Sequence, residues 1–430
     1  MPASLSITIA GAGIAGCAAA IALAQAGHAV QVIERAARWE FASSGIFLYA
    51  NGLESLRDLG VLPAILRAGF AVPEGRNAYF DQSGMPLTVT HYPSRDAGRI
   101  PAILGIRRAE LHRILSMRMQ ELGVPVTLDA SIALLAQRGG RVSLTLSDGR
   151  ALETDLLVIA EGLRSTTRAL AGFDVAPRYS GFTVWRSVHA RPAALTDKIM
   201  QMGRGKRFGI MPISDDRLYT FGTVPGPKPA HIPRADWPAT MAGQFAEFDG
   251  PARAFLDDLG PRSEVLFTAI EEVALPLPWH RGRVVVIGDA AHAATPFMGQ
   301  GGAAAMADGV ALARHLSRAA PEPALAAFGA ERQPICAFVQ EASRRVGELG
   351  ALETDADIAA RNARMRGGGA QAQVDTFYAR LTEFDSEVPV RSGDPFWGAA
   401  ICRHVVAARR RLVGPRAHRA AGFRHAKVGV

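Results

Sequence analysis

Hydrophobic residues along the chain follow two spacings, short β-branched runs and longer stretches with helical periodicity. Near the amino terminus this pattern predicts a strand over Leu5–Ala10, a helix over Ile14–Ala26 and a strand over Val30–Ile33. A second unit begins with the apolar run Val284–Ile287, and helical spacing resumes from about Ala303. Because buried strands alternate with helices here, the pattern predicts a parallel sheet covered by helices.

The middle of the chain has a different pattern of short strands and close turns. It predicts a mostly antiparallel sheet inserted into the α/β fold. The segments expected as strands are the hairpin Tyr79–Thr90 and then Phe182–His189, Phe208–Pro212 and Leu218–Val224. A helix-rich stretch over Trp237–Leu259 follows them.

Toward the carboxyl terminus the spacing is helical again. Helices are expected over Ala351–Arg366, ended by the glycines at 367–369, over Val374–Phe384, and from Asp394 onward. These patterns divide the chain into three parts. They are an α/β domain (1–74, 106–174 and 281–365), an inserted sheet domain (75–105 and 175–280) and a helical extension with a basic tail (366–430).

Composition and charge narrow the class of protein. The 430 residues are 48% hydrophobic and 20% charged, as in ordinary soluble globular proteins. The formal net charge of +8 comes from the tail, because eight Lys/Arg and no acidic residue follow Cys402. A neutral body with a solvated basic end does not predict nucleic acid as a partner. Since Cys17, Cys336 and Cys402 have neither disulfide nor metal-ligand spacing, we expect a cytoplasmic protein without a metal site.

The apolar stretch Leu5–Ala24 is about long enough to cross a bilayer. No Lys or Arg precedes it, however, and Gly11, Gly13 and Gly16 interrupt it. We therefore expect a βαβ unit at this place and no stable membrane insertion.

The glycines of this unit form the run Gly11-Ala12-Gly13-Ile14-Ala15-Gly16 between the first strand and the first helix. In such a run the first glycine permits a tight turn, the second lets the backbone approach a pyrophosphate, and the third lets helix and strand pack closely. Glu34 ends the next strand, 23 positions after the first glycine, where an acceptor for ribose hydroxyls belongs. The unit predicts a bound dinucleotide, and the acidic residue favours FAD or NAD over NADP.

Two later strand ends carry comparable turns. Residues 161–165 read EGLRS, and residues 288–301 read GDAAHAATPFMGQG ahead of a helix. Backbone N–H groups and the helix dipole at such a turn face a ligand. Taken alone, the turn at 288–301, the third along the chain, is also compatible with an ordinary strand–loop–helix connection. His292 within it has no His or Cys nearby in the sequence, which favours a fixed element of the loop over a metal ligand.

The three motifs together, GAGIAG with Glu34, EGLRS at 161–165 and GDAAHAATPFMGQG at 288–301, resemble the fingerprints of class A FAD-dependent aromatic hydroxylases. These are flavoprotein monooxygenases of the para-hydroxybenzoate and salicylate hydroxylase type. The resemblance extends from residue 5 to about residue 345. It implies a GxGxxG FAD-binding Rossmann-like domain, an inserted, mostly antiparallel β-sheet substrate domain and a helical C-terminal extension, in a monomer or homodimer.

The resemblance also implies which residues contact FAD. Those at the pyrophosphate are Gly11, Gly13, Ile14, Ala15 and Gly16. Those at the adenosine side are Glu34 for the ribose, Arg35 beside the adenine and Arg108 at the ribose–pyrophosphate region. Those on the flavin side are Asp289 for the ribitol or pyrophosphate, Pro296 on the isoalloxazine face, and Gly299, Gly301 and Gly302, the last two with their amides at the N1–C2=O edge.

The activity implied by the resemblance is hydroxylation of a small aromatic or N-heteroaromatic substrate. NADPH or NADH, as a transient co-substrate, would reduce the flavin, and O2 would give a flavin C4a-hydroperoxide. Besides Pro296, we expect Arg207 and Tyr219 at the reaction site, because the run from Gly205 to Phe208 resembles the substrate-facing stretch of flavin-dependent urate hydroxylases. Further candidates for the pocket wall are Tyr49, Trp185, Arg186 and Phe297.

One position departs from the family, and three other functions stay open. The second motif has Glu161 where the family usually has Asp, so contacts to FAD and NAD(P)H and the nicotinamide preference are undecided. A flavin-dependent halogenase would carry a WxWxIP stretch, which the sequence lacks. A flavoprotein that serves as a cyclisation scaffold would keep FAD without hydroxylation. A membrane-associated epoxidase would need an amphipathic segment, for which His404–Leu412 is the candidate.

Overall fold

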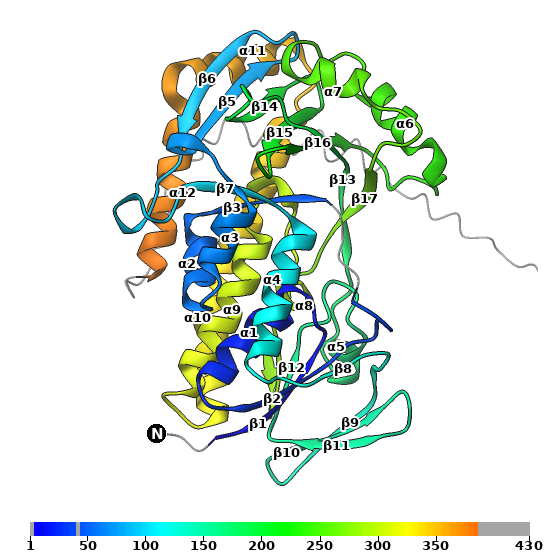
Figure 1. Cartoon of the computed structure of the whole chain (residues 1–430), viewed down its shortest axis with the longest axis vertical. Coiled ribbons are helices and arrows are strands. Elements are labelled where there is room, and N and C mark those ends of the chain that lie inside the picture. Colours follow the sequence, from blue (N-terminus) through cyan, green and yellow to red (C-terminus); the bar gives the residue numbers. More distant parts are fainter. Residues whose placement is uncertain (1–3, 40–43, 386–430) are drawn as a thin grey trace, which may run out of the picture. The chain divides into compact units, whose positions relative to one another are not determined.

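The structure is a computed structural model that describes residues 4–39 and 44–385 (Figure 1). The helix expected from Asp394, the segment His404–Leu412 and the basic tail lie outside the described residues. Among the described residues, every helix is too short or too polar to span a bilayer.

A six-stranded sheet with the strand order β18-β19-β12-β1-β2-β8 is the centre of the α/β part. All neighbouring strands in it are parallel except β18 and β19. Its strands are β1 Ser6–Ala10, β2 Ala29–Ile33, β8 Val126–Thr127, β12 Leu156–Ile159, β18 His280–Arg281 and β19 Val284–Val286. Strands β12 and β19 are buried along their whole length, which explains their unbroken apolar sequences.

Three helices pack beside one another in this part, α1 (Ile14–Gln25), α4 (Arg108–Glu121) and α9 (Gly301–Leu316). Half of the residues of α1 are alanine, and this allows α9 to approach its backbone closely. A Cβ atom added to Gly309 of α9 would lie 2.6 Å from the backbone nitrogen of Ala19. Small residues at this crossing are therefore required by the available space.

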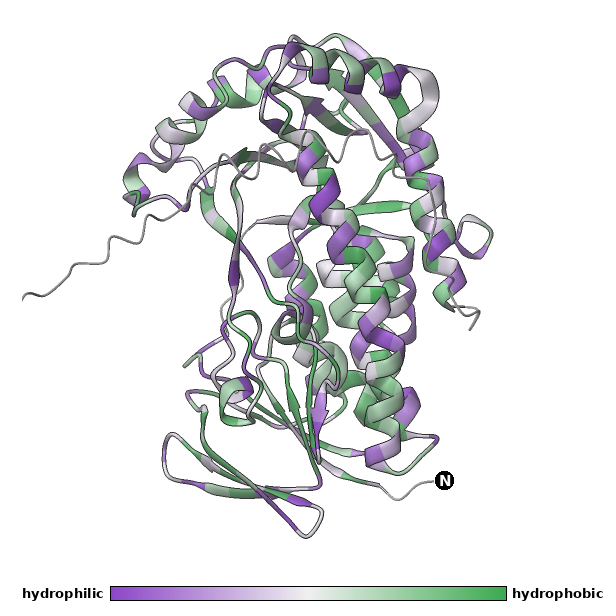
Figure 2. Cartoon of the chain, turned by 180° about the vertical axis from the view of Figure 1, so that it is seen from behind, coloured by the Kyte–Doolittle hydropathy of each residue, from purple (hydrophilic) through white to green (hydrophobic). Residues whose placement is uncertain are grey.

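The remaining helices of the α/β part are shorter, except for one. They are α2 Ala50–Asp58, α3 Leu62–Ala68, α5 Thr166–Leu170, α8 Asp289–His292 and the long α10 Pro321–Gly350. Helix α10 carries hydrophilic and hydrophobic residues along its length, as expected for a helix with one buried side (Figure 2).

A seven-stranded sheet with the order β17-β13-β16-β15-β14-β5-β6 is the second large sheet. Only the β14–β5 pair is parallel. Its strands are β5 Arg76–Asp81, β6 Pro86–His91, β13 Arg178–Ala190, β14 Lys198–Met202, β15 Arg207–Pro212, β16 Arg217–Pro225 and β17 Val265–Glu272. The hairpin β5–β6 thus joins strands that follow about a hundred residues later in the sequence. Strands β14 and β17 were not predicted.

The two faces of this sheet bury different sets of residues. The outer face packs against helices α6 (Trp237–Gln244) and α7 (Arg253–Asp257) around Phe208, Phe245 and Phe248. The inner face packs with the short strand β3 (Gly45–Tyr49) and with the carboxyl-terminal helices. This architecture confirms the predicted α/β fold with an inserted, mostly antiparallel sheet. The boundaries proposed for the three parts stay predictions.

Two three-stranded sheets complete the strand inventory of the described residues. One has the order β3-β7-β4, with β7 at Ile103–Arg107 and β4 at Phe70–Ala71. The other has the order β11-β10-β9, with β9 at Ile132–Arg138, β10 at Arg141–Leu146 and β11 at Ala151–Thr154.

The carboxyl-terminal helices differ from the prediction at the glycines. Helix α11 (Asp355–Arg364) is followed by a π-helical segment over Met365–Gly369, and α12 (Ala370–Asp385) continues from it. Gly368 adopts φ +87°, a conformation that glycine accepts without steric cost. The glycines therefore redirect the helical path and do not open a loop, so α12 packs against the inner face of the seven-stranded sheet near β6.

Candidate active site

A cavity of about 540 Å³ extends between the turns of the six-stranded sheet and the inner face of the seven-stranded sheet. This size is typical of small-molecule and cofactor sites. The predicted residues on its wall are Gly11, Gly13, Ile14, Ala15, Glu34, Arg35, Arg108, Arg207, Tyr219, Asp289, Pro296, Gly299, Gly301 and Gly302. Three turns distant in sequence therefore share one cavity with the inserted sheet.

The glycines of the first turn differ in what surrounds them. A Cβ atom on Gly16 would lie 1.9 Å from the carbonyl oxygen of Gly11, and one on Gly11, at φ +99°, would lie 2.7 Å from that of Ala160. A Cβ atom on Gly13 would meet nothing within 4 Å, and it borders the cavity. Gly16 is thus a packing position that does not line the cavity, while Gly13 leaves room beside bare backbone. This cradle fits a pyrophosphate.

Glu34 reaches the cavity from the end of β2. Its carboxylate accepts hydrogen bonds from the backbone nitrogens of Ala12 (2.8 Å) and Ala36 (2.9 Å). The carbonyl oxygen of the same residue, Ala12, accepts a hydrogen bond from the Nε2 of His112 at 2.6 Å. Burial, opposed by this hydrogen bond, lowers the pKa of His112 below its usual value. His112 was not predicted, although it follows Arg108 by one helical turn and so lies on the same side of α4.

The two arginines at the start of α4 have separate surroundings. Arg108 lines the cavity, as expected for a residue that faces a phosphate. Arg107 forms an ion pair with Glu264 at 3.5 Å and is partly exposed. Arg35 lies on the cavity wall and is exposed to solvent.

Glu161 lines the cavity, but its carboxylate is turned to the next helix. It accepts hydrogen bonds from the Ser165 hydroxyl (2.5 Å), the Thr167 hydroxyl (2.7 Å) and the Thr167 backbone nitrogen (3.0 Å). The carboxylate therefore caps the amino-terminal end of α5.

The third turn places several groups on another part of the cavity wall. Gly288 adopts φ +61° at the end of β19, and Asp289 opens α8 on the cavity wall. A short 3-10 helix, Pro296–Met298, then leads to α9, whose first residues, Gly301 and Gly302, have no side-chain cap. A Cβ on Gly301 would meet nothing within 4 Å. Free amides beside open space at a helix start suit an anionic ligand edge.

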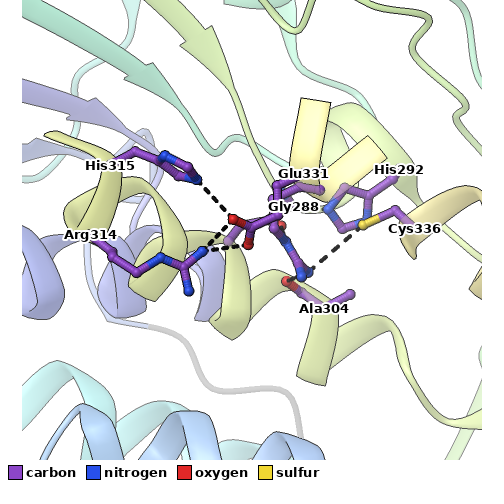
Figure 3. A network of polar contacts seen from close by, with 9 residues as sticks. Gly288, His292, Ala304, Arg314, His315, Glu331 and Cys336 are labelled. Atoms are coloured by element: carbon purple, nitrogen blue, oxygen red, sulfur yellow. Dashed lines mark hydrogen bonds and ion pairs between the residues drawn. The ribbon is translucent and has the colours of Figure 1, made fainter. Parts of the chain in front are cut away.

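Behind this turn lies a buried polar network that includes His292 (Figure 3). The Nε2 of His292 lies 2.6 Å from the Oδ2 of Asp308, and the Nε of Arg332 donates to the Oδ1 of the same carboxylate at 2.8 Å. His292, Asp308 and Cys336 bring possible metal ligand atoms within 4.8 Å of one another. The guanidinium of Arg332 already supplies Asp308 with the positive charge that a metal ion would supply.

The sheet end of the cavity contains Arg207. Its side chain is 4% exposed, its Nε donates to the Thr223 hydroxyl at 3.4 Å, and its guanidinium lies 4.4 Å from the centre of the Phe297 ring. No carboxylate of the described residues lies within ion-pair distance of it. Burial lowers the pKa of Arg207 to about 10. A buried cation without a carboxylate partner is unfavourable until an anionic or carbonyl oxygen binds.

Tyr219 lies on the neighbouring strand β16, where it pairs with Met211, four residues after Arg207 on β15. Burial raises the pKa of Tyr219, and Arg186 partly offsets this rise. Arg186 also lines the cavity and donates to the Thr268 hydroxyl at 3.0 Å. Tyr219 stays a neutral hydrogen-bonding group at physiological pH.

Of the other wall candidates, Arg186 and Phe297 line the cavity. Trp185 points to the opposite face of the sheet, because side chains alternate along β13, and is buried with Phe267. Tyr49 is buried behind Phe47, where its hydroxyl accepts a hydrogen bond from Lys198 at 2.9 Å.

Lys198 is a buried residue that the sequence did not indicate, because β14 was not predicted. It is 4% exposed, and its Nζ lies 4.5 Å from the centre of the Phe47 ring. Phe47 lines the cavity. Burial, reinforced by the charge of Arg207, lowers the pKa of Lys198 to about 7. A second buried basic group, Lys198, therefore lies behind the Phe47 side chain, outside the lining that includes Arg207.

Comparison with known proteins agrees with this site. Residues 4–343 match the family described as FAD binding domain. Aurachin C monooxygenase/isomerase from Stigmatella aurantiaca is 33% identical over 82% of this chain and 91% of its own length. The 2-heptyl-3-hydroxy-4(1H)-quinolone synthase of Pseudomonas aeruginosa is 32% identical over 84% of this chain and 94% of its own.

A solved structure supports the same relationship. HpxO of Klebsiella pneumoniae, complexed with FAD and uric acid, superposes with a TM-score of 0.77 at 27% identity, over 87% of this chain and 97% of that chain. The chain is thus an FAD-dependent enzyme that belongs to the class A flavoprotein monooxygenase family.

Proposed function

We propose that the protein hydroxylates a small aromatic or N-heteroaromatic substrate at the expense of NAD(P)H and O2. The observation that carries this proposal is the continuity of one cavity from the three nucleotide-type turns to Arg207 and Tyr219. The chemistry that FAD supplies when bound in such enzymes is the transfer of electrons from NAD(P)H to O2. The work left to the protein is to hold the cofactor, orient the substrate and exclude water.

The groups proposed to hold FAD are mostly backbone. Gly13 and the start of α1 suit the pyrophosphate, and Glu34 suits the adenosine ribose, with Arg35 and Arg108 on the same wall. The α9 amides suit the anionic edge of the ring, because a helix amino terminus stabilises negative charge.

The substrate end is proposed to bind a planar ring with at least one anionic or carbonyl oxygen. The guanidinium of Arg207 is the group that would take this oxygen, with Tyr219 as a neutral hydrogen-bond partner. Phe47, Phe221 and Phe297 line the same space and would fix the plane of the ring. The relatives include a quinolone synthase and a urate hydroxylase, which favours an N-heteroaromatic ring as the substrate.

The test is a substrate screen on the purified FAD-loaded protein. 4-Quinolones, purines and hydroxybenzoates are tested one at a time with NADH or NADPH. Nicotinamide oxidation, O2 uptake and product mass are measured in the same reactions. We expect at least one N-heteroaromatic compound to stimulate oxidation and to gain one oxygen atom. Ligand-induced changes in the flavin spectrum without stimulated oxidation would instead favour the scaffold function, and incorporation of halide or an epoxide product would favour the halogenase or epoxidase.

A further inference from the structure

Asp308 connects the third turn to two helices, although it lies outside the cavity. It is fully buried on α9, two helical turns after Gly301. Its Oδ2 accepts hydrogen bonds from the backbone nitrogen of Gly288 (2.8 Å) and from His292 (2.6 Å), and its Oδ1 accepts one from Arg332 (2.8 Å).

Each of these bonds ends on a different element. Gly288 directly precedes Asp289, so the first bond holds the turn that presents Asp289 to the cavity. His292 is the last residue of α8, and its ring stacks on Trp279 with 5.3 Å between centroids. Arg332 belongs to α10 and also donates to the carbonyl oxygen of Ala304 in the first turn of α9. One carboxylate thus joins the turn, α8, α9 and α10.

The charges within the network support one another. Burial alone would raise the pKa of Asp308, but His292 and Arg332 outweigh it and lower the pKa to about 2. Burial alone would lower the pKa of His292, but the neighbouring Cys336 and Asp308 outweigh it and hold this pKa well above its usual value. A buried ion network with satisfied hydrogen bonds rigidifies the elements it joins, and removal of one charge leaves the others without compensation.

A metal ion is the competing explanation of this cluster. Three ligand types are present, but Arg332 already satisfies Asp308 and would be repelled by a cation. A metal site would not require the hydrogen bonds from Gly288 to Asp308 and from Arg332 to Ala304. A unit that positions the loop would require both.

We propose that Asp308, together with His292 and Arg332, is a positioning unit that holds Asp289 and the amides of α9 at the spacing that FAD requires. None of the three residues lines the cavity, so their effect on FAD would pass through the loop. The inference depends on FAD binding and not on the proposed hydroxylation, and it survives if no substrate is ever found.

The test compares Asp308→Asn with a control variant in the neighbouring ion cluster, Glu331→Gln. Glu331 pairs with Arg314 and His315 at the surface of the same helices and makes no bond to the turn (Figure 3). FAD affinity is measured from flavin fluorescence on dilution of the holoenzyme, and hydrogen–deuterium exchange is followed over 288–292 and 301–305. We expect Asp308→Asn to weaken FAD binding at least tenfold and to speed exchange in both segments, and Glu331→Gln to change either by less than twofold.

A second variant covers the event that Asp308→Asn fails to fold. His292→Gln removes the imidazole and keeps the Arg332 bond, and we expect a smaller loss of FAD affinity with faster exchange over 288–292. If FAD affinity and exchange in these segments are unchanged in a folded variant, the proposal is overturned. A stoichiometric metal in the purified protein, with exchange that increases on chelation, would also overturn it in favour of a metal site.

Discussion

The two ends of the cavity are built from different kinds of groups. At the nucleotide end the wall is largely backbone, with glycines at 11, 13, 301 and 302 and the acidic residues Glu34, Glu161 and Asp289. At the sheet end the wall is side chains, with Arg207 and Tyr219 projecting from neighbouring strands among aromatic rings. The nucleotide end depends on where a Cβ atom is absent, and the sheet end depends on which side chains share one face of a sheet. We therefore expect the nucleotide end to be sensitive to an added Cβ atom and the sheet end to be sensitive to the loss of a side chain.

The largest effect should separate two glycines of the same turn. Gly16→Ala places a Cβ 1.9 Å from the Gly11 carbonyl oxygen, so we expect a loss of stability of about 3 kcal/mol or more. Gly13→Ala places its Cβ in open space, so stability should change by less than about 1 kcal/mol, while FAD affinity falls at least tenfold. Urea denaturation of the apoprotein and FAD titration measure the two quantities. Equal losses of stability in both variants would contradict this division.

The next largest effect is expected at Arg207, the buried cation without a carboxylate partner among the described residues. Arg207→Met should lower kcat/KM for the substrate about a hundredfold, which corresponds to about 2.7 kcal/mol. It should leave FAD affinity unchanged and should not lower stability, because a buried charge without a carboxylate partner is removed. Thermal unfolding, FAD titration and steady-state kinetics give the three values. The control is Arg204→Met, an exposed position on the preceding turn. A large drop in melting temperature for Arg207→Met alone would assign this arginine to the core.

Lys198 predicts a dependence of stability on pH. Its pKa is about 7 in the folded protein, against about 10.4 in an unfolded chain. Between these values the unfolded state binds more protons, so the contribution of Lys198 to folding stability increases with pH. In Lys198→Met this contribution is absent. The free energy of unfolding of the variant relative to wild type should therefore fall by about 1.4 kcal/mol per pH unit between pH 7.5 and 9.5.

Urea denaturation of both proteins at several pH values measures this slope. Other groups around the amine are Tyr49, Tyr92 and Arg207, and burial raises the pKa of both tyrosines. Lys228→Met, which removes an exposed lysine, should show no such slope. A difference between Lys198→Met and wild type that is independent of pH would show that Lys198 keeps its charge throughout.

The smallest effect is expected at Glu161, on the nucleotide side. Glu161→Asp shortens the carboxylate that caps α5, so the bonds to Ser165 and Thr167 should weaken and stability should fall by about 0.5–1 kcal/mol. Differential scanning calorimetry measures this change. The ratio of NADH to NADPH oxidation in the same variant tests whether the position affects the nicotinamide preference. If the ratio of NADH to NADPH oxidation and the stability both equal those of wild type, the length of the Glu161 side chain affects neither the nicotinamide preference nor the capping of α5.

The success of sequence reasoning follows the same division. The turn at Gly11–Gly16, the strand before Glu34 and the third turn were readable, because strand, glycine spacing and helix lie within about thirty contiguous residues. Strand β14 was missed, and with it Lys198. A strand buried at all but one position, which pairs with β5 more than a hundred residues earlier, shows no polar–apolar alternation that would reveal it.

The sequence by itself determined the α/β fold, the three turns and the FAD-binding family, since each rests on local conformation that a few glycines and apolar residues dictate. Only the tertiary structure decided that Gly16 packs while Gly13 opens to the cavity, that Trp185 faces away from it, and that Asp308 joins the turn to three helices. These facts depend on which atoms from distant segments meet in space. Contacts between such segments follow from strand register and helix packing, which a single sequence does not state.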